Sequence, residues 1–199
     1  TASIGIACTN SAGARCDAQE LLRFADTAMH DAKTLGRGQV NVFDLGLAER
    51  AVTRLQLGND LRDALDNDHL DLNYQPIVEL ATGRVLGVEA LARWQHPEHG
   101  RVTPTEFVSV AEDQGMAQHL DTWALNRACR DMVRLRQHLG PSATVSVNIS
   151  AQHLAGTGLE ATVVEALGDS GLPADALVLE ITESAAMQDI THARELLGR

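Results

Sequence analysis

The chain has few of the features that mark several protein classes. Its three cysteines, Cys8, Cys16 and Cys129, show neither metal-binding spacing nor a paired framework, which fits packing roles in a reducing compartment. No apolar run approaches the roughly 18 residues of a membrane helix, and no signal peptide is recognisable. We therefore expect a cytoplasmic chain without a membrane segment, although a longer parent protein could carry an upstream membrane or sensory region.

Histidine and serine motifs are also missing. No H-x-x-x-H, H-E-x-x-H or G-x-S-x-G spacing occurs, which argues against a histidine zinc site and a serine nucleophile. Most of the scattered histidines are expected at the surface.

Positive charge is scarce, with 16 Lys and Arg against 27 Asp and Glu and a formal net charge of −11. Such a chain offers no basic patch for a nucleic-acid backbone, so nucleic acid is not an expected partner. A small phosphorylated ligand held by a few cations stays compatible. The 44% hydrophobic content supports one or two globular domains.

The order of patterns indicates two regions. A strand, a long helix and a short strand precede a boundary near Asp44 to Ala48, and a helix follows to about Leu65. From Leu70 two strands are separated by a turn at Gly83, and further strands then alternate with helices. Such alternation predicts βαβ units and a parallel sheet. Thr103, Pro104 and Glu106 predict a helix start with a capping box.

Three predicted strands each carry one oxygen donor in an otherwise apolar setting. They are Glu89 in RVLGVEALARW, Asn148 in TVSVNIS and Glu180 in LVLEITE. Hard oxygen ligands suit magnesium, manganese or calcium, whose natural chemistry is activation of water against a phosphoryl group. Taken singly, each could be a buried polar residue with a structural partner. Three on consecutive strands favour a metal site.

Other candidates keep two interpretations. Arg93, four residues beyond Glu89, could grip a phosphate or stack on a base, or it could be a solvated arginine at a strand end. Gln75 before Pro76 could contact a ligand or belong to a turn. Lys33 and Arg37 sit at the end of the first long helix, where cations complement the helix dipole.

Three motifs carry a family resemblance. YQPIVELATGRVLGVEALARWQHPEHGRVTPTEF, VNISAQHL and LEITES resemble successive signature segments of the EAL domain, the bacterial phosphodiesterase module for cyclic di-GMP. SIGIA and ADTAMHDAKTLGRG resemble the carboxyl-terminal end of a GGDEF domain. The chain therefore looks like the junction of a tandem GGDEF-EAL protein: residues 1–44 would end the GGDEF domain, 45–60 would be a connecting helix, and 61–199 would begin the EAL domain.

The resemblance implies an α/β fold. It would be part of a TIM-like (β/α)8 barrel with an antiparallel first strand, preceded by the last piece of an α+β GGDEF domain. It also implies a homodimer through the EAL domain, and hydrolysis of cyclic di-GMP to linear pGpG with a pair of Mg²⁺ or Mn²⁺ ions.

The implied site residues fall into four groups. They are catalytic Glu89, Glu180 and Glu183; substrate-binding Gln75, Leu91 and Arg93; metal-ligating Glu89, Asn148 and Glu180; and phosphate-binding Lys33 and Arg37 on the GGDEF side.

Further family motifs lie outside this sequence. The GGDEF signature and the D-D-F-G-T-G segment, which supplies more metal ligands in the family, do not occur in it. We therefore expect the parent protein to be the phosphodiesterase and these 199 residues alone to be inactive. The alternatives are a non-catalytic cyclic di-GMP receptor or scaffold, and a bifunctional protein with diguanylate cyclase activity.

Overall fold

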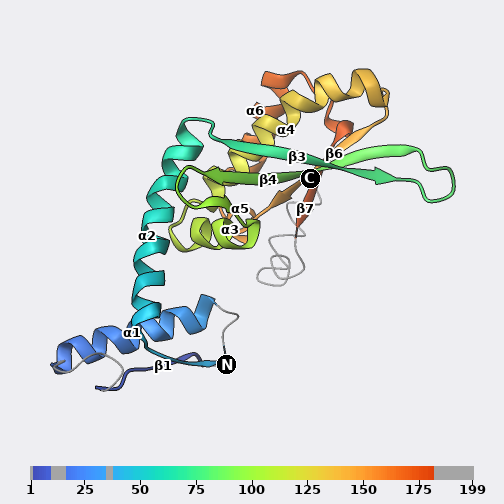
Figure 1. Ribbon diagram of the computed structural model, residues 1–199. Coiled ribbons are helices and arrows are strands. Elements are labelled where there is room, and N and C mark those ends of the chain that lie inside the picture. The colour runs from blue at the N-terminus through green and yellow to red at the C-terminus, as the bar shows by residue number, and fades with distance from the viewer. Residues whose placement is uncertain (1, 10–16, 35–37, 182–199) are drawn as a thin grey trace. The chain divides into compact units, whose positions relative to one another are not determined.

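The structure is a computed structural model that describes residues 2–9, 17–34 and 38–181 (Figure 1). The chain divides into two compact units, Thr1–Asp60 and Leu61–Arg199. Within the described ranges, no helix has the length and apolar character needed to cross a membrane.

The first unit contains two short parallel strands and one helix. Its elements are β1 (Ile4–Ile6), α1 (Ala18–Thr34) and β2 (Val40–Val42), followed by α2 (Leu45–Asp66), which runs on into the second unit. Gly5 permits a close approach of α1, because an added Cβ would lie 2.0 Å from the carbonyl oxygen of Ala25. Phe24 stacks on the buried Phe43 with ring centroids 4.2 Å apart. This aromatic pair and the buried Ala28 form a small core.

The second unit is a five-stranded mixed sheet with helices. Its elements are β3 (Leu70–Val78), β4 (Val85–His96), β5 (Gly100–Val102), α3 (Pro104–Asp113), α4 (Ala117–Leu139), β6 (Thr144–Ile149), α5 (Ala151–Ala155), α6 (Leu159–Ser170), the short 3-10 turn η1 (Ala174–Ala176) and β7 (Leu177–Ile181). The strand order is β3-β4-β6-β7, with β5 paired to β4. Strands β4, β6 and β7 are parallel, whereas β3 and β5 run antiparallel to β4. The predicted parallel pairing is therefore confirmed for β4, β6 and β7.

Strands β3 and β4 form the predicted hairpin, which extends beyond the rest of the sheet (Figure 1). Gly83 has φ +70°, and the Glu79 N–H donates to the Arg84 carbonyl oxygen at 2.9 Å across the turn. Pro76 lies inside β3, which is tolerated because β3 is an edge strand. A register shift follows between Ile77 and Val78.

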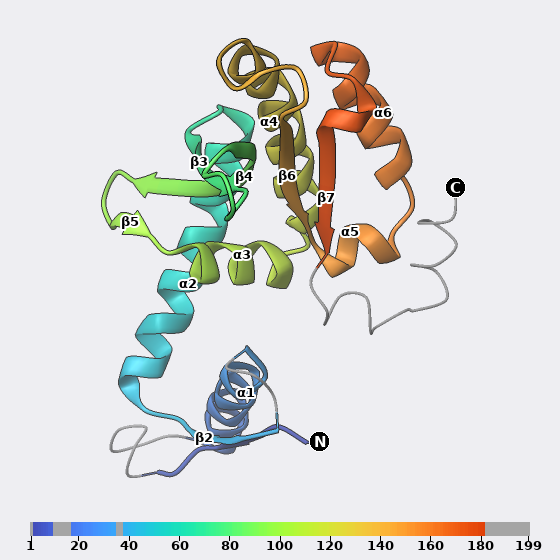
Figure 2. The ribbon, with the colours of Figure 1, turned by 90° about the vertical axis from the view of Figure 1, so that its right-hand side faces the viewer.

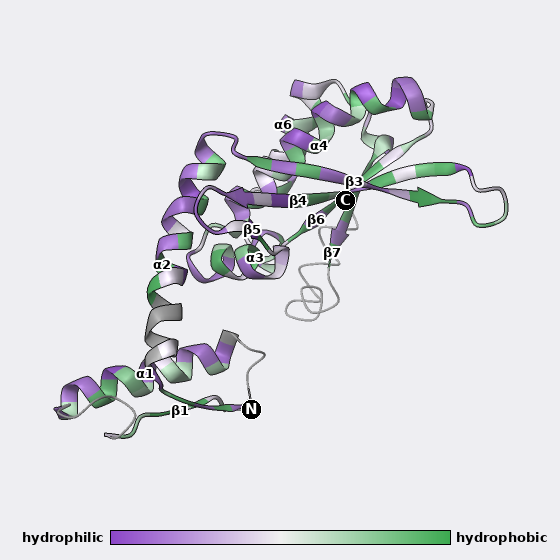
Figure 3. Ribbon diagram, viewed as in Figure 1, coloured by the Kyte–Doolittle hydropathy of each residue, from purple (hydrophilic) through white to green (hydrophobic). Residues whose placement is uncertain are grey.

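One face of this sheet carries the core. Val145, Val147 and Ile149 of β6 are at most 2% exposed. Helix α4 contacts β3, β4 and β6, and α3 contacts β4. Hydrophilic and hydrophobic residues alternate along β3 (Figure 3), as expected for a strand whose side chains point to opposite faces. We call the side packed against α3 and α4 the helix-covered face.

Several local expectations were wrong. Strand β5 and helix α5 were not predicted, because each has five residues or fewer. Helix α3 does begin after Thr103, but the Thr103 side chain makes no capping hydrogen bond. Cys8 is exposed and is not a packing residue, whereas Cys129 is buried. Cys16 lies outside the described residues.

Most of the histidines that the structure describes are exposed, as expected, and two are buried. His96 is 5% exposed and His153 is 3% exposed, so neither lies at the surface. The His96 ring stacks edge-on against Trp94, with centroids 5.2 Å apart.

Candidate functional site

The face of the sheet opposite α3 and α4 carries most of the predicted site residues that the structure describes, and we call it the polar face. Its members are Asp71, Asn73, Gln75, Gly87, Glu89, Leu91, Arg93, Ser146, Asn148, Val178 and Glu180. The strand register places them together, because residues paired across neighbouring strands point to the same side. Ser146 is buried, whereas Asn148 and Gln75 are exposed.

The three oxygen-bearing residues lie on adjacent strands. The Asn148 Nδ2 donates to Glu89 Oε1 at 3.0 Å, which joins β6 to β4. Glu180 of β7 is directly opposite Asn148 in the parallel register. The amide therefore stands between two half-buried carboxylates. Asn148 and Glu180 are each one residue from the carboxyl-terminal end of their strand, whereas Glu89 lies inside β4.

This set suits a hard divalent cation in chemistry and in number. Mg²⁺ takes oxygen ligands and keeps several waters, so a few protein oxygens suffice. No group of three or more His, Cys, Asp or Glu side chains is arranged to hold a metal among the described residues. Glu89, Asn148 and Glu180 are two carboxylates and one amide, so they are not such a group of three. Their donor chemistry fits the expected ion.

Arg93 is half-buried near the end of β4. Its Nη1 donates to the Ala92 carbonyl oxygen at 2.8 Å. Its Nε is buried and makes no hydrogen bond with any residue that the structure describes. A buried donor without a partner is costly, and an anion at this position would satisfy it.

Gln75 and Leu91 flank this arrangement. Gln75 lies within β3 directly opposite Glu89, so its interpretation as a turn residue is wrong. Leu91 is half-buried and opposite Asn73. The structure thus brings Gln75, Glu89 and Leu91 onto the polar face from two neighbouring strands.

The remaining predicted residues are not part of this arrangement. Lys33 is exposed in the last turn of α1, in the first unit. Arg37 and Glu183 lie outside the described residues.

A buried polar cluster beside the site was not predicted. Asp121 of α4 is 6% exposed, and its Oδ2 accepts from Ser150 Oγ at 2.7 Å and from the Ser150 N–H at 2.9 Å. Burial raises the pKa of Asp121, while the hydrogen bonds from Ser150 and the nearby His153 act in the opposite direction. The sequence signal that could have revealed this cluster is the acidic Asp121, which lies between Leu120 and Trp123 of a predicted apolar helical stripe.

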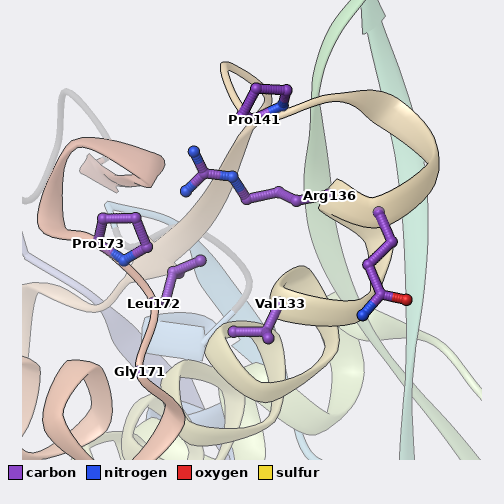
Figure 4. A pocket seen from close by; sticks show the side chains of 7 residues that line it. Val133, Arg136, Pro141, Gly171, Leu172 and Pro173 are labelled. Atoms are coloured by element: carbon purple, nitrogen blue, oxygen red, sulfur yellow. The ribbon is translucent and has the colours of Figure 1, made fainter.

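A separate open pocket of about 330 Å³ lies between the end of α4 and the loop after α6. The Arg136 side chain extends between Pro141 and Pro173 (Figure 4). Of the predicted site residues that the structure describes, none lines this pocket. The polar face is therefore the better candidate for the functional site.

The sequence profile of the EAL domain matches residues 58–199. The chain belongs to the EAL domain family. The predicted resemblance to the EAL domain is thereby confirmed, and the mixed α/β fold agrees with solved EAL structures.

Two relatives with named functions are similar over nearly the whole chain. The cyclic di-GMP phosphodiesterase NbdA of Pseudomonas aeruginosa is 42% identical over 199 residues, which are 100% of this chain and 25% of that protein. The bifunctional diguanylate cyclase/cyclic di-GMP phosphodiesterase MucR of the same organism is 41% identical over 189 residues, or 95% of this chain and 27% of MucR. The chain thus spans about a quarter of the length of these relatives.

A solved structure of a c-di-GMP phosphodiesterase is also similar to this chain. The PaMucR phosphodiesterase in complex with c-di-GMP superimposes with a TM-score of 0.68 and 40% identity, covering 72% of this chain and 58% of that one.

Proposed function

We propose that the protein containing this chain is a metal-dependent cyclic di-GMP phosphodiesterase that produces linear pGpG. The observation that carries the proposal is the meeting of Glu89, Asn148 and Glu180 on one face of three parallel strands. The similarity to a phosphodiesterase solved with c-di-GMP supports the choice of substrate.

In this proposal the chain's own residues hold the reacting groups. Glu89, Asn148 and Glu180 would ligate Mg²⁺ or Mn²⁺ in a two-ion site, to which other parts of the complete protein would contribute further ligands. A bound divalent ion supplies Lewis-acid polarisation of a phosphoryl oxygen and makes a water molecule more acidic. Arg93 would neutralise a phosphate through its guanidinium, whose Nε has no partner among the described residues, while Gln75 and Leu91 would position the dinucleotide. Glu89, Glu180 and Glu183 would be the catalytic carboxylates.

The proposal extends to architecture. The polar face would line the interior of a (β/α)8 barrel, since parallel strands with helices on the outer side form that fold. Residues 1–44 would be the end of a GGDEF domain, 45–60 a connecting helix, and 61–199 the first part of the EAL domain. The similarity to MucR, a protein named for a diguanylate cyclase activity as well as a phosphodiesterase activity, supports the assignment of residues 1–44 to a GGDEF domain.

Three further features rest on the resemblance. Lys33 and Arg37 would contact phosphates on the GGDEF side. The EAL domain would form a homodimer, which light scattering of the complete protein tests. The location would be cytoplasmic.

A bifunctional protein is the second candidate, favoured by the similarity to MucR.

The test uses the complete protein with Mg²⁺ or Mn²⁺ and cyclic di-GMP, with the nucleotides separated by chromatography. We expect pGpG from the wild type and none above background from Glu89→Gln, which removes one charged ligand but keeps the side-chain shape. Binding of cyclic di-GMP without formation of pGpG would show that the protein is a receptor and not a phosphodiesterase. GTP conversion to cyclic di-GMP by the same preparation would establish the bifunctional alternative.

A further inference from the structure

A buried carboxylate of α4 holds the residue that follows β6. Asp121 Oδ2 accepts both the backbone N–H and the hydroxyl of Ser150. The Ser150 hydroxyl oxygen in turn accepts the His153 N–H at 3.2 Å, so that Ser150 caps α5. Two accepted hydrogen bonds on one charged oxygen make a strong and directional contact.

This contact lies next to a predicted metal ligand. Asn148 is the penultimate residue of β6, and Ser150 comes directly after the strand ends at Ile149. Ends of elements open more easily than their middles. Here the end is held on both sides of Asn148, by the burial of Val147 and Ile149 and by the carboxylate bond to Ser150. Figure 2 shows α5 at the carboxyl-terminal end of β6 and β7.

The cluster contains serine, histidine and aspartate, but its geometry does not fit a hydrolytic triad. The Ser150 hydroxyl donates to Asp121 and not to His153. The His153 Nδ1 is 3.3 Å from Asp121 Oδ2 without hydrogen-bond alignment, and the His153 side chain is 3% exposed. A triad needs a serine activated by the histidine and open to substrate. The arrangement is suited to holding the backbone.

We propose that Asp121 is a positioning residue that, through Ser150, orients Asn148 toward Glu89 and Glu180 for metal binding. The inference rests on the proposed function, because it gives Asn148 a role as ligand. Asp121 itself would touch neither metal nor substrate. Its removal would let the end of β6 rotate or fray, so the Asn148 oxygen would leave the ligand set.

The test compares Asp121→Asn with Asp131→Asn in the complete protein. Asp131 is a matched control, because it lies on the same helix and its Oδ2 accepts from Tyr74 of β3 at 2.9 Å, away from the end of β6. Mn²⁺ alone is titrated and the free ion is followed by electron paramagnetic resonance. We expect the Kd for Mn²⁺ to rise about tenfold in Asp121→Asn, as for lost supporting contacts around metal ligands, and to be unchanged in Asp131→Asn.

Two further variants and a kinetic readout separate positioning from stability. Ser150→Ala removes the hydroxyl bond and is expected to weaken Mn²⁺ binding less than Asp121→Asn, while Ser150→Thr keeps the hydroxyl and should bind as the wild type does. In Asp121→Asn, kcat should fall while KM for cyclic di-GMP stays the same. Wild-type Mn²⁺ affinity in Asp121→Asn, with a melting temperature lowered as in Asp131→Asn, would overturn the inference.

Hydrogen exchange tests the inference independently of the proposed function. In the absence of metal, amides 147–150 should exchange faster in Asp121→Asn than in Asp131→Asn. If the wild type bound no Mn²⁺, the proposed function would fail while this exchange difference could still stand. Equal exchange in the two variants would show that Asp121 does not hold the strand end.

Discussion

The two faces of the sheet in the second unit show opposite uses of the same strands. On the helix-covered face, Val145, Val147 and Ile149 are almost fully buried against helices. On the polar face, Asn148 and Glu180 leave polar atoms available, and Arg93 keeps a buried donor without a partner among the described residues. Buried polar groups cost stability unless they are satisfied. The apolar face therefore stabilises a polar face that is arranged for a ligand.

The largest effect should come from Asn148→Ala on the polar face. Losing the ligand is expected to lower cyclic di-GMP hydrolysis by the complete protein about a thousandfold, because metal-assisted polarisation contributes several kcal/mol. The melting temperature should change little, since Asn148 is exposed. Activity assays and thermal unfolding of one preparation check both statements. A large loss of stability with metal binding intact would remove the contrast between the faces.

The helix-covered face should respond in the opposite way. Met132 of α4 is 0% exposed, so Met132→Ala is expected to lower the free energy of unfolding by about 2–5 kcal/mol through a cavity and lost burial. Its neighbour Val133 is 36% exposed, and Val133→Ala serves as the control with a change within about 0.5 kcal/mol. Urea unfolding of the chain measures the difference. Equal effects would show that α4 is not packed as described.

A smaller effect is expected at Tyr74, which points to the helix-covered face from β3. Its hydroxyl donates to Asp131 Oδ2, and burial followed by this carboxylate raises the pKa of Tyr74. Tyr74→Phe should cost about 1 kcal/mol in unfolding free energy, whereas Asn73→Ala on the exposed side of the same strand should cost almost nothing. Urea denaturation of both variants at neutral pH tests this difference. An unchanged denaturation midpoint in Tyr74→Phe would contradict the hydrogen bond between Tyr74 and Asp131.

The smallest effect concerns two cysteines. Burial raises the pKa of Cys129 from 9.0 to about 11, while Cys8 is exposed. Because the thiol pKa is higher in the folded chain, the neutral thiol contributes to the free energy of unfolding. This contribution is complete below about pH 9 and is lost as the pH rises through about 11. Iodoacetamide at pH 8, followed by peptide mass spectrometry, should label Cys8 and spare Cys129 until urea is added. Early labelling of Cys129 would mean that the core opens locally.

Sequence patterns predicted the two faces because burial acts on every second residue of a strand. The alternation of Val145, Ser146, Val147 and Asn148 is strong enough to reveal both sides. The hairpin was predictable because Gly83 supplies the positive φ that its turn requires. The short β5 and α5 were not predictable, because a few residues carry too little periodicity.

The site was only partly visible in the sequence. Period two places Glu89, Asn148 and Glu180 on one face of their strands, but it cannot say that Asn148 donates to Glu89. Asp121 was missed for a related reason. A helical stripe reports that a position is buried, yet the partner of Asp121 is 29 residues away in Ser150. Such pairs depend on how a helix packs on the sheet, which periodicity does not encode.

Pro76 gives the two outer strands of this sheet unequal capacities to recruit another chain. At β3, an incoming strand meets a residue without a backbone donor, and the register shift after Ile77 bends the edge. At β7, the segment Leu177–Ile181 contains no proline, so each of its residues carries a backbone donor and an acceptor. A strand added beside β7 would therefore meet a backbone donor at every residue of Leu177–Ile181, which a strand added beside β3 would not.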